Sequence, residues 1–233
     1  MCAVFTEFAV FAEFAAAGRE QPSGRWVMSR YATLAFTDQV RAFQEEAGSA
    51  RANAHAVDAD PRPDPLTETE ARFITEREDC YLATVGETGW PYVQYRGGPP
   101  GFVHVLDEHR LAFLDVRGNR QYITGGNLRG DARISVLFLD FAFQRRLKIL
   151  GRAETRALDE APELAEAVAE PRTDGRAEHV LVITVEGFAW NCPQHITQRF
   201  TRAEFGEALA GVEQRMRALR AENAELRRRL GER

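Results

Sequence analysis

Cysteine is scarce in this chain of 233 residues, which has only Cys2, Cys80 and Cys192. The number is odd and no Cys-x-x-Cys pair occurs, so the sequence favours neither a disulfide framework nor a structural zinc site. The five histidines show no metal-ligand spacing either. Free thiols of this kind are typical of a reducing compartment, and we expect a cytoplasmic protein that holds no metal.

Long apolar runs and an excess of positive charge are also missing. No hydrophobic stretch approaches the ~20 residues needed to cross a bilayer. Acidic residues outnumber basic ones by 35 to 30, for a formal net charge of −5, whereas nucleic-acid binding depends on a basic surface. We therefore expect neither a membrane nor nucleic acid as a partner. With 44% hydrophobic residues, the chain can bury one good core, and one domain with appendages is the expected organisation.

Four segments follow one another along the chain. Residues 1–27 carry phenylalanine at every third position from Phe5 to Phe14, which is either an apolar helical stripe or part of an upstream extension without stable structure. Residues 28–65 combine a helix at 36–48 with a Pro-rich linker at 49–65. We expect the main domain over residues 66–200 and a long helix over residues 201–233.

The main domain is predicted to begin with a helix and to continue as a set of short strands. Thr67 and Glu70 match a capping box, and the helix that follows turns Phe73 and Ile74 inward. The first strand, 81–85, reads as buried largely on both sides. Further strands are expected at 90–98, 101–106, 110–115, 132–140, 145–156 and 178–190, with short helices at 119–128 and 159–170. Short strands with regularly spaced turns favour a barrel over a parallel sheet.

The C-terminal helix carries apolar residues at alternating spacings of three and four. This seam consists of Leu209, Val212, Met216, Leu219, Asn223, Leu226 and Leu230, which is a heptad pattern with Asn223 at an a position. A single Asn at this position pairs with its twin in a parallel two-stranded coiled coil. The alternative is that the helix packs back on its own domain, but the stripe is narrow for that arrangement. We expect a homodimer that the coiled coil reinforces.

The stretch from Cys80 to Thr155 resembles a known family. It reads CYLATVG, a turn at ETG, WPYVQYRGG, FVHVLD, LAFLDVRGNRQYITGGNL, ARISVLFLDF and RRLKILGRAET. In this form it is similar to the pyridoxamine 5′-phosphate oxidase superfamily of FMN-binding split barrels. The resemblance implies a mainly β (α+β) fold, in which a split β-barrel has flanking helices and here also the C-terminal helix. It further implies FMN as the cofactor, bound in a groove of a dimer.

The resemblance also indicates which residues would form the flavin site. The family's strand beneath the flavin ring falls on Gln94, Tyr95, Arg96 and Gly97, and the strand before its phosphate turn ends at Asp115. Its Ser-Arg-Lys phosphate motif falls on Asn119, Arg120 and Gln121, so that Gln121 replaces a lysine and removes one charge.

A second group lies later in the chain. The family's Arg-Gln-Val strand falls on residues 145–151, where Arg146 replaces the glutamine and Lys148 adds a further charge. The stretch WNCPQH recurs in similar bacterial proteins, and its Trp190, Asn191 and His195 would close over the cofactor from the neighbouring subunit. Without the resemblance, GGPPG is simply a hairpin turn and the arginines are solvated charges at strand ends.

Two classes of function remain open from the sequence. The first is an FMN-dependent oxidoreductase acting on a small, planar substrate. Because the flavin supplies the redox chemistry, the absence of a Ser-His-Asp order, an H-E-x-x-H motif or a Walker loop is no objection. The second is a non-catalytic barrel that binds flavin, deazaflavin or haem as a carrier or sensor, which the lost lysine at Gln121 favours. Oxidation of pyridoxamine 5′-phosphate itself is not expected, since the family's C-terminal Trp…Arg tail has no match.

Overall fold

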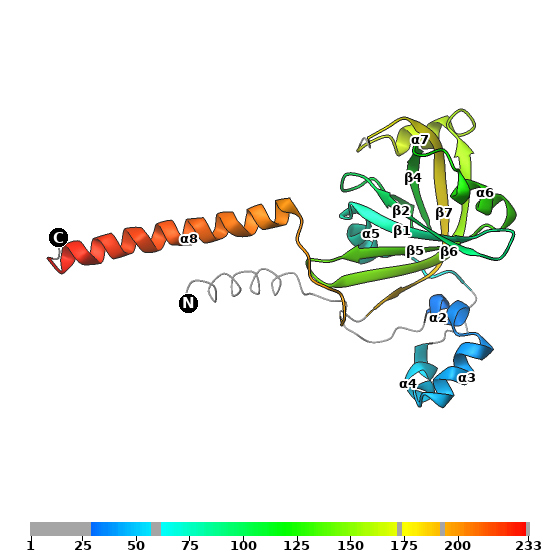
Figure 1. The fold of residues 1–233 in the computed structure, drawn as a ribbon, viewed down its shortest axis with the longest axis horizontal. Coiled ribbons are helices and arrows are strands. Elements are labelled where there is room, and N and C mark those ends of the chain that lie inside the picture. Colours follow the sequence, from blue (N-terminus) through cyan, green and yellow to red (C-terminus); the bar gives the residue numbers. More distant parts are fainter. Residues whose placement is uncertain (1–28, 57–61, 172–173, 192–193, 232–233) are drawn as a thin grey trace. The chain divides into compact units, whose positions relative to one another are not determined.

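The computed structural model of this chain describes residues 29–56, 62–171, 174–191 and 194–231 (Figure 1). The chain divides into two compact units: a barrel unit of residues 25–140 and 145–193, and a C-terminal unit that includes residues 141–144 and 194–233. The expected stripe of phenylalanines in residues 1–27 lies outside the described residues.

The centre of the barrel unit is a seven-stranded sheet in the order β2-β1-β5-β6-β7-β4-β3. Every pair of neighbours in it is antiparallel. The strands are β1 (Asp79–Val85), β2 (Pro91–Gly97), β3 (His104–Asp107), β4 (Arg110–Val116), β5 (Arg133–Asp140), β6 (Arg145–Ala157) and β7 (Ala177–Trp190). This mainly β (α+β) architecture with flanking helices confirms the fold class predicted from the sequence.

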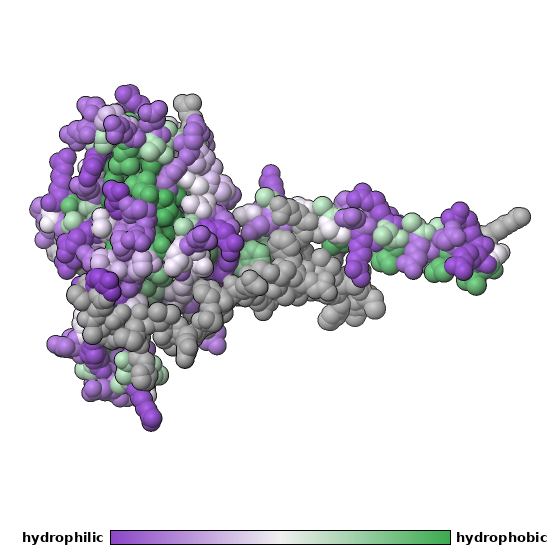
Figure 2. Space-filling model, turned by 180° about the vertical axis from the view of Figure 1, so that it is seen from behind, coloured by the Kyte–Doolittle hydropathy of each residue, from purple (hydrophilic) through white to green (hydrophobic). Residues whose placement is uncertain are grey.

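The core is formed by alternate residues of these strands. On β1, Cys80, Leu82 and Thr84 are buried, whereas Val85 is 39% exposed. The expectation that β1 is buried largely on both sides is therefore wrong for its end, because one face of the strand looks away from the core. The largest fully buried side chains on the other strands include Leu111, Phe113, Val136, Phe138, Leu147, Ile149, Val180, Leu181 and Ile183. Figure 2 shows a strip of hydrophobic residues on one face of the barrel unit, bordered by hydrophilic ones.

Helices flank the sheet and connect its strands. They are α2 (Arg30–Ala35), α3 (Asp38–Glu46), α4 (Ala50–Asn53), the 3₁₀ turn η1 (Ala54–Ala56), α5 (Glu68–Thr75), α6 (Ile123–Gly130) and α7 (Pro162–Ala167). Thr37 caps α3, and the capping box of Thr67 and Glu70 is present on α5, with Phe73 and Ile74 buried as predicted. The segment expected as a linker contains α4 and η1, and α7 is shorter than its predicted range of 159–170. The sequence pattern did not indicate α2.

Helix α2 is joined to β7 through the side chain of Asp64. The carboxylate of Asp64 accepts hydrogen bonds from the backbone N–H groups of Arg30 (2.8 Å), Tyr31 (3.2 Å) and Phe188 (3.1 Å). A Cβ at Gly187 would lie 2.4 Å from the backbone nitrogen of Tyr31, so only glycine allows this approach. One carboxylate therefore joins the first turn of α2 to the final part of β7.

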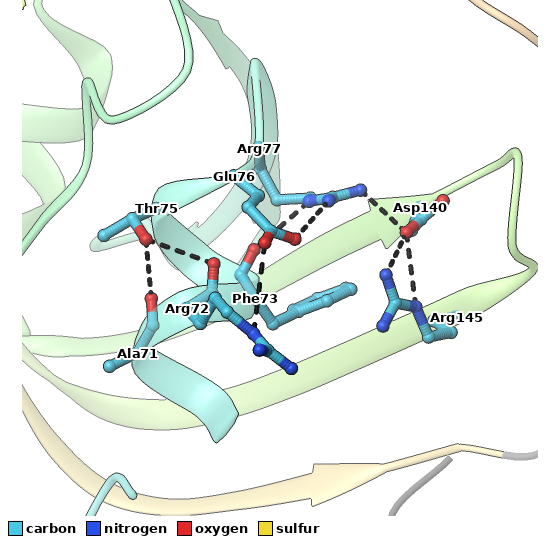
Figure 3. A network of polar contacts seen from close by, with 8 residues as sticks. All are labelled: Ala71, Arg72, Phe73, Thr75, Glu76, Arg77, Asp140 and Arg145. Atoms are coloured by element: carbon cyan, nitrogen blue, oxygen red, sulfur yellow. Dashed lines mark hydrogen bonds and ion pairs between the residues drawn. The ribbon is translucent and has the colours of Figure 1, made fainter. Parts of the chain in front are cut away.

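A polar cluster joins α5 to the hairpin of β5 and β6 (Figure 3). Asp140 is 2% exposed and lies between the guanidinium groups of Arg77, at 3.0 Å, and Arg145, at 2.7 Å. Both guanidinium groups also lie over the ring of Phe73, at 4.8 and 5.2 Å from its centroid. Two cations thus share one buried carboxylate and one aromatic ring.

The C-terminal unit contains α8 (Arg202–Arg229), which begins with a capping box formed by Thr201 and Glu204. Large apolar side chains along this helix remain half exposed, namely Leu209, Met216, Leu219 and Leu226. Asn223 accepts a hydrogen bond from Nε of Arg227 at 2.8 Å. Within the described residues, no helix has both the length and the apolar character needed to cross a bilayer.

Candidate functional site

A pocket of about 500 Å³ opens between β2, the ends of β4 and β7, and the first turn of α6. Its lining is polar on the sheet side, where Gln94 and Arg96 of β2 face Asp115 of β4 and His179 of β7. The loop that follows β4 completes the wall with Asn119, Arg120, Gln121 and Tyr122. Six of the residues predicted for a flavin site line this pocket: Gln94, Arg96, Asp115, Asn119, Arg120 and Gln121.

The sheet wall of the pocket is held by an ion pair. Nη2 of Arg96 lies 3.2 Å from Oδ1 of Asp115, and both side chains are about four-fifths buried. Burial raises the pKa of Asp115, while Arg96 and then His179 oppose the shift and Glu178 adds to it. The Nε atom of Arg96 is buried and has no hydrogen-bond partner among the described residues. This donor is therefore unsatisfied, but it has no surface that a ligand in the pocket could reach.

A register shift at the start of β7 brings two consecutive residues to the pocket. Asp115 pairs with His179 and Val116 pairs with Ala177, so the register skips Glu178. In a regular strand, neighbouring side chains point to opposite faces, and a bulge is a common way of changing that direction. Here both Glu178 and His179 line the pocket.

Glu178 organises the rim of the pocket. Its carboxylate accepts hydrogen bonds from Nε of Arg117 at 2.6 Å and from the hydroxyl of Tyr122 at 3.0 Å. The bond from Arg117 is the main cause of a lowered pKa for Glu178, and it raises the pKa of Arg117 in return. A hydrogen bond between Arg120 and Tyr122 likewise raises the pKa of Arg120. Glu178, Arg117 and Arg120 therefore keep their charges at neutral pH.

The turn before α6 has an unusual backbone. Arg120 and Tyr122 have φ angles of +62° and +51°, in the left-handed region that non-glycine residues seldom adopt. The helix starts only at Ile123, with Tyr122 as N-cap. The predicted start at Asn119 is therefore wrong: the Asn119 side chain instead accepts a hydrogen bond from the N–H of Gln121 and closes a local turn. Backbone strain of this kind often accompanies functional sites.

The first turn of α6 leaves room for a ligand. Thr124, Gly125 and Gly126 line the pocket, and so does Gly118 in the preceding loop. A Cβ added at Gly118 or Gly126 would meet no atom within 4 Å. Because the first N–H groups of a helix have no intrahelical partner, this turn presents donors to an open space. Together with Arg120 and Arg129, which also line the pocket, it can hold an anion.

Seven predicted residues lie elsewhere. Tyr95 and Gly97 are on β2 but on the other face from Gln94 and Arg96, and the ring of Tyr95 packs edge-on against Tyr81. Neither lines the pocket.

Lys148 and Arg146 are on β6, next to the end of β7 that lies farthest from the pocket residues of that strand. The ammonium group of Lys148 lies 4.9 Å from the ring centroid of Tyr31, and burial followed by the charge of Arg146 lowers its pKa. The structure thus places Lys148 against α2 rather than at the pocket of its own chain.

Trp190 and Asn191 follow at the same end of β7. The indole Nε1 of Trp190 donates to Glu70 at 2.7 Å, and the ring packs edge-on against Phe73. The backbone N–H of Asn191 donates to the carbonyl of Arg146. His195 belongs to the C-terminal unit, where it is exposed and has a φ angle of +68°.

Several pocket residues were not predicted, notably Tyr92, Tyr122, Arg129, Glu178 and His179. The pair Glu178-His179 at the start of an otherwise apolar strand was the available signal, but the alternation of a regular strand assigns only one of them to a given face. Within the described residues, no group of three His, Cys, Asp or Glu side chains is placed to hold a metal ion.

Comparison with known proteins gives one family and a set of solved structures. The family model described as pyridoxamine 5′-phosphate oxidase matches residues 66–191. No curated protein matches the chain. HupZ of Group A Streptococcus is 18% identical, with 58% of this chain and 100% of that chain covered and a TM-score of 0.45. A putative pyridoxamine 5′-phosphate oxidase of Lactobacillus delbrueckii is 22% identical, with 54% and 94% covered and a TM-score of 0.42. A structure named F420 reductase is 20% identical, with 54% and 98% covered and a TM-score of 0.35.

Proposed function

Because this chain belongs to the pyridoxamine 5′-phosphate oxidase family, we propose that it is an FMN-dependent oxidoreductase that acts on a small, planar substrate as a homodimer. The observation that carries the proposal is the pocket itself. It gathers Arg96, Arg120 and Arg129 around a helix N-terminus, in a cavity of about 500 Å³, which is within the usual range for small-molecule and cofactor sites.

The residues of the pocket fit a flavin phosphate. A phosphate needs cationic groups and N–H donors, and the first turn of α6 with Arg120 and Arg129 offers both. The guanidinium group of Arg96 also lines the pocket and is a further cationic group for an anion. Asn119 and Gln121 add amide groups at the mouth, so that Gln121 replaces the charge of the family's lysine by hydrogen-bonding capacity.

The bound flavin would supply the hydride chemistry, and the chain's own residues would bind and orient it. Arg120 and the α6 amides would hold the phosphate end, while Gln94 and Tyr92 offer polar contacts along β2, where the hydroxyl of Tyr92 donates to the Gln94 side chain. The pocket is open at the exposed turn of residues 117–122, which leaves an approach for a substrate.

A second copy of the chain would complete the site. Trp190 is eleven residues along β7 from His179, a path of roughly 35 Å in an extended strand. Arg146, Lys148, Trp190 and Asn191 therefore belong to a different end of the sheet from the pocket. Trp190 is held within its own chain by Glu70, and Lys148 by Tyr31. We infer that Asn191, and His195 after it, approach the pocket of the partner in a homodimer.

The outer face of the sheet suits such a dimer. A cross-strand row runs from Tyr95 through Tyr81 and Leu137 to Lys148, and its neighbour Val93 is 62% exposed. All of them lie on the side of the sheet that faces away from the core. The exposed members of this surface, Val93 and Tyr95, favour an interaction surface at this end of the row, whereas Lys148 at the other end lies against Tyr31 of α2.

The test is FMN binding by a variant of the strained turn. Arg120→Ala should weaken FMN binding about tenfold, because it removes a charge-assisted contact at an exposed position. Arg156→Ala is the matched control, since Arg156 pairs with Glu154 on β6 and does not line the pocket. Equal dissociation constants for wild type and Arg120→Ala would overturn the assignment of the phosphate site.

The absorption spectrum of the purified protein separates the two classes of function. A flavin band supports the proposal, whereas a Soret band or a colourless protein that binds no added FMN contradicts it. For the enzyme activity, the reduced protein is mixed with quinones, nitro compounds and enones in stopped flow. If only oxygen reoxidises the bound flavin, and at the rate of free flavin, the protein is a carrier or sensor and not a reductase.

A further inference from the structure

The guanidinium group of Arg96 is shared between a carboxylate and the pocket. Its Nη2 pairs with Asp115 at 3.2 Å, while its Nε is buried and has no partner in the described part of the chain. Because Arg96 and Asp115 both line the pocket, an anion that enters it and approaches this guanidinium group would lie beside the carboxylate of Asp115. Two negative groups would then compete for one cation in a partly buried place, where like charges raise one another's proton affinity.

His179 lies directly across the ladder from Asp115 and lines the same pocket. Side chains opposite each other on antiparallel strands have Cβ atoms only about 5 Å apart. The bulge at Glu178 adds a second carboxylate, but Arg117 and Tyr122 already hold that one through hydrogen bonds. Asp115 is thus the carboxylate whose charge an incoming anion would oppose most directly.

The other charged groups around Asp115 determine the net charge of the pocket wall. Arg96 faces it from β2, and His179 and Glu178 face it from β7. Arg120 of the turn and Arg129 of α6 complete the lining. Because Arg117 already compensates Glu178, the three arginines Arg96, Arg120 and Arg129 meet only the carboxylate of Asp115. A phosphate dianion would use up this surplus of positive charge while lying next to Asp115, and like charges raise one another's proton affinity.

We propose that the pocket binds its phosphate-bearing ligand with the uptake of a proton by Asp115, beside Arg96. The proton comes from solvent, and the only bond formed is that between the proton and an oxygen of Asp115. This carboxyl group makes ligand affinity depend on pH and on the charge of the ligand. The inference rests on the proposed function for the identity of the ligand, FMN, but not for the anion chemistry.

The test is titration calorimetry of FMN in two phosphate-free buffers that differ in ionisation enthalpy, from which the number of protons taken up per ligand is obtained. The phosphate of FMN titrates in the same way with every variant, so the difference between proteins is the readout. Wild type should take up about one proton more than Asp115→Asn, in which the amide still accepts from Arg96. Asp115→Asn should also bind FMN more tightly at pH 8, by about tenfold, because a like charge is gone.

Three controls accompany this experiment. Asp107→Asn removes a carboxylate that pairs with Arg110 outside the pocket, and it should leave proton uptake unchanged. Arg96→Gln removes the shared cation, and it should weaken FMN binding and abolish the difference that Asp115→Asn makes. Riboflavin lacks the phosphate and should bind without Asp115-dependent proton uptake.

The outcomes separate the inference from the proposed function. Equal proton numbers for wild type and Asp115→Asn with FMN would overturn the inference and leave the FMN site standing. Proton uptake with inorganic phosphate that depends on Asp115, in a protein that binds no FMN, would support the inference and overturn the function. Failure of both FMN and inorganic phosphate to bind would overturn both.

Discussion

Replacement of Asp140 should test how much the buried polar cluster beneath α5 contributes to stability. Asp140 is 2% exposed, and the side chains of its partners Arg77 and Arg145 are only 14% and 19% exposed. Asp140→Ala removes the carboxylate from two largely buried guanidinium groups, although Arg77 keeps Glu76 and the carbonyl of Phe73 as partners. Removing one partner of a buried ion pair costs about 3–5 kcal/mol. This is a large part of the free energy of unfolding of a domain, which is usually ~5–15 kcal/mol.

The measurement is urea unfolding followed by circular dichroism. With a slope of about 2 kcal/mol per molar urea, the expected loss moves the midpoint down by roughly 2 M. Asp140→Asn keeps an acceptor for both arginines and should fall between wild type and Asp140→Ala. The matched control is Asp131→Ala, because Asp131 pairs with Arg133 at a similar distance, 2.5 Å, on the surface. Solvent screens such a pair, so its midpoint should hardly move.

A midpoint for Asp140→Ala within a few tenths of a molar of the control would refute this reasoning. It would mean that Arg77 and Arg145 regain water or that their remaining contacts are sufficient when the carboxylate is absent. The stacking of both arginines on Phe73 (Figure 3) would then be sufficient to hold α5 against the sheet.

Three further outcomes are expected. Gly187→Ala places a Cβ 2.4 Å from the backbone of Tyr31, so it should lower the free energy of unfolding by about 1–3 kcal/mol and make residues 29–35 sensitive to protease. An unchanged digest would contradict the fixed position of α2. Cys80 is fully buried, and burial followed by the charge of Asp79 raises its pKa to about 12. Iodoacetamide at pH 8 should therefore label it only in urea, and labelling of the native protein would show that β1 opens. Asn223→Leu should strengthen self-association but loosen its stoichiometry, and light scattering that gives a monomer for the intact protein would remove both the coiled coil and the shared site.

Much of the fold could be predicted because its signals are local. The capping box at Thr67, the alternation in the strands and the turn at residues 87–89 each depend on a few neighbouring residues, and the structure has the elements that they indicate. Helix α2 escaped prediction because its position depends on Asp64 and Gly187, which lie about 30 and 150 residues away along the chain. No pattern within six residues encodes such contacts.

The distinction between local signals and contacts distant in the sequence also applies to the site. The turn of Asn119, Arg120 and Gln121 could be located from the resemblance, since a phosphate motif is a short sequence. Its conformation could not, because the left-handed backbone at Arg120 and Tyr122 depends on how β4 ends and on the hydrogen bond from Tyr122 to Glu178. A helix start at Asn119 is the simpler local solution, and the tertiary contact overrides it.

The bulge at the start of β7 connects fold and function most directly. If β7 kept a regular register, His179 would face the pocket beside Asp115 while Glu178 would point to the other face. The skipped residue turns both inward, so that Glu178 can take the charge of Arg117 and hold Tyr122. Glu178 thereby compensates the charge of Arg117 and fixes the turn before α6. Arg96, Arg120 and Arg129 remain as the cations for a ligand. One extra residue in the ladder thus decides which charges of this pocket are available, and that is why the pair Glu178-His179 matters although the sequence pattern gives it no special weight.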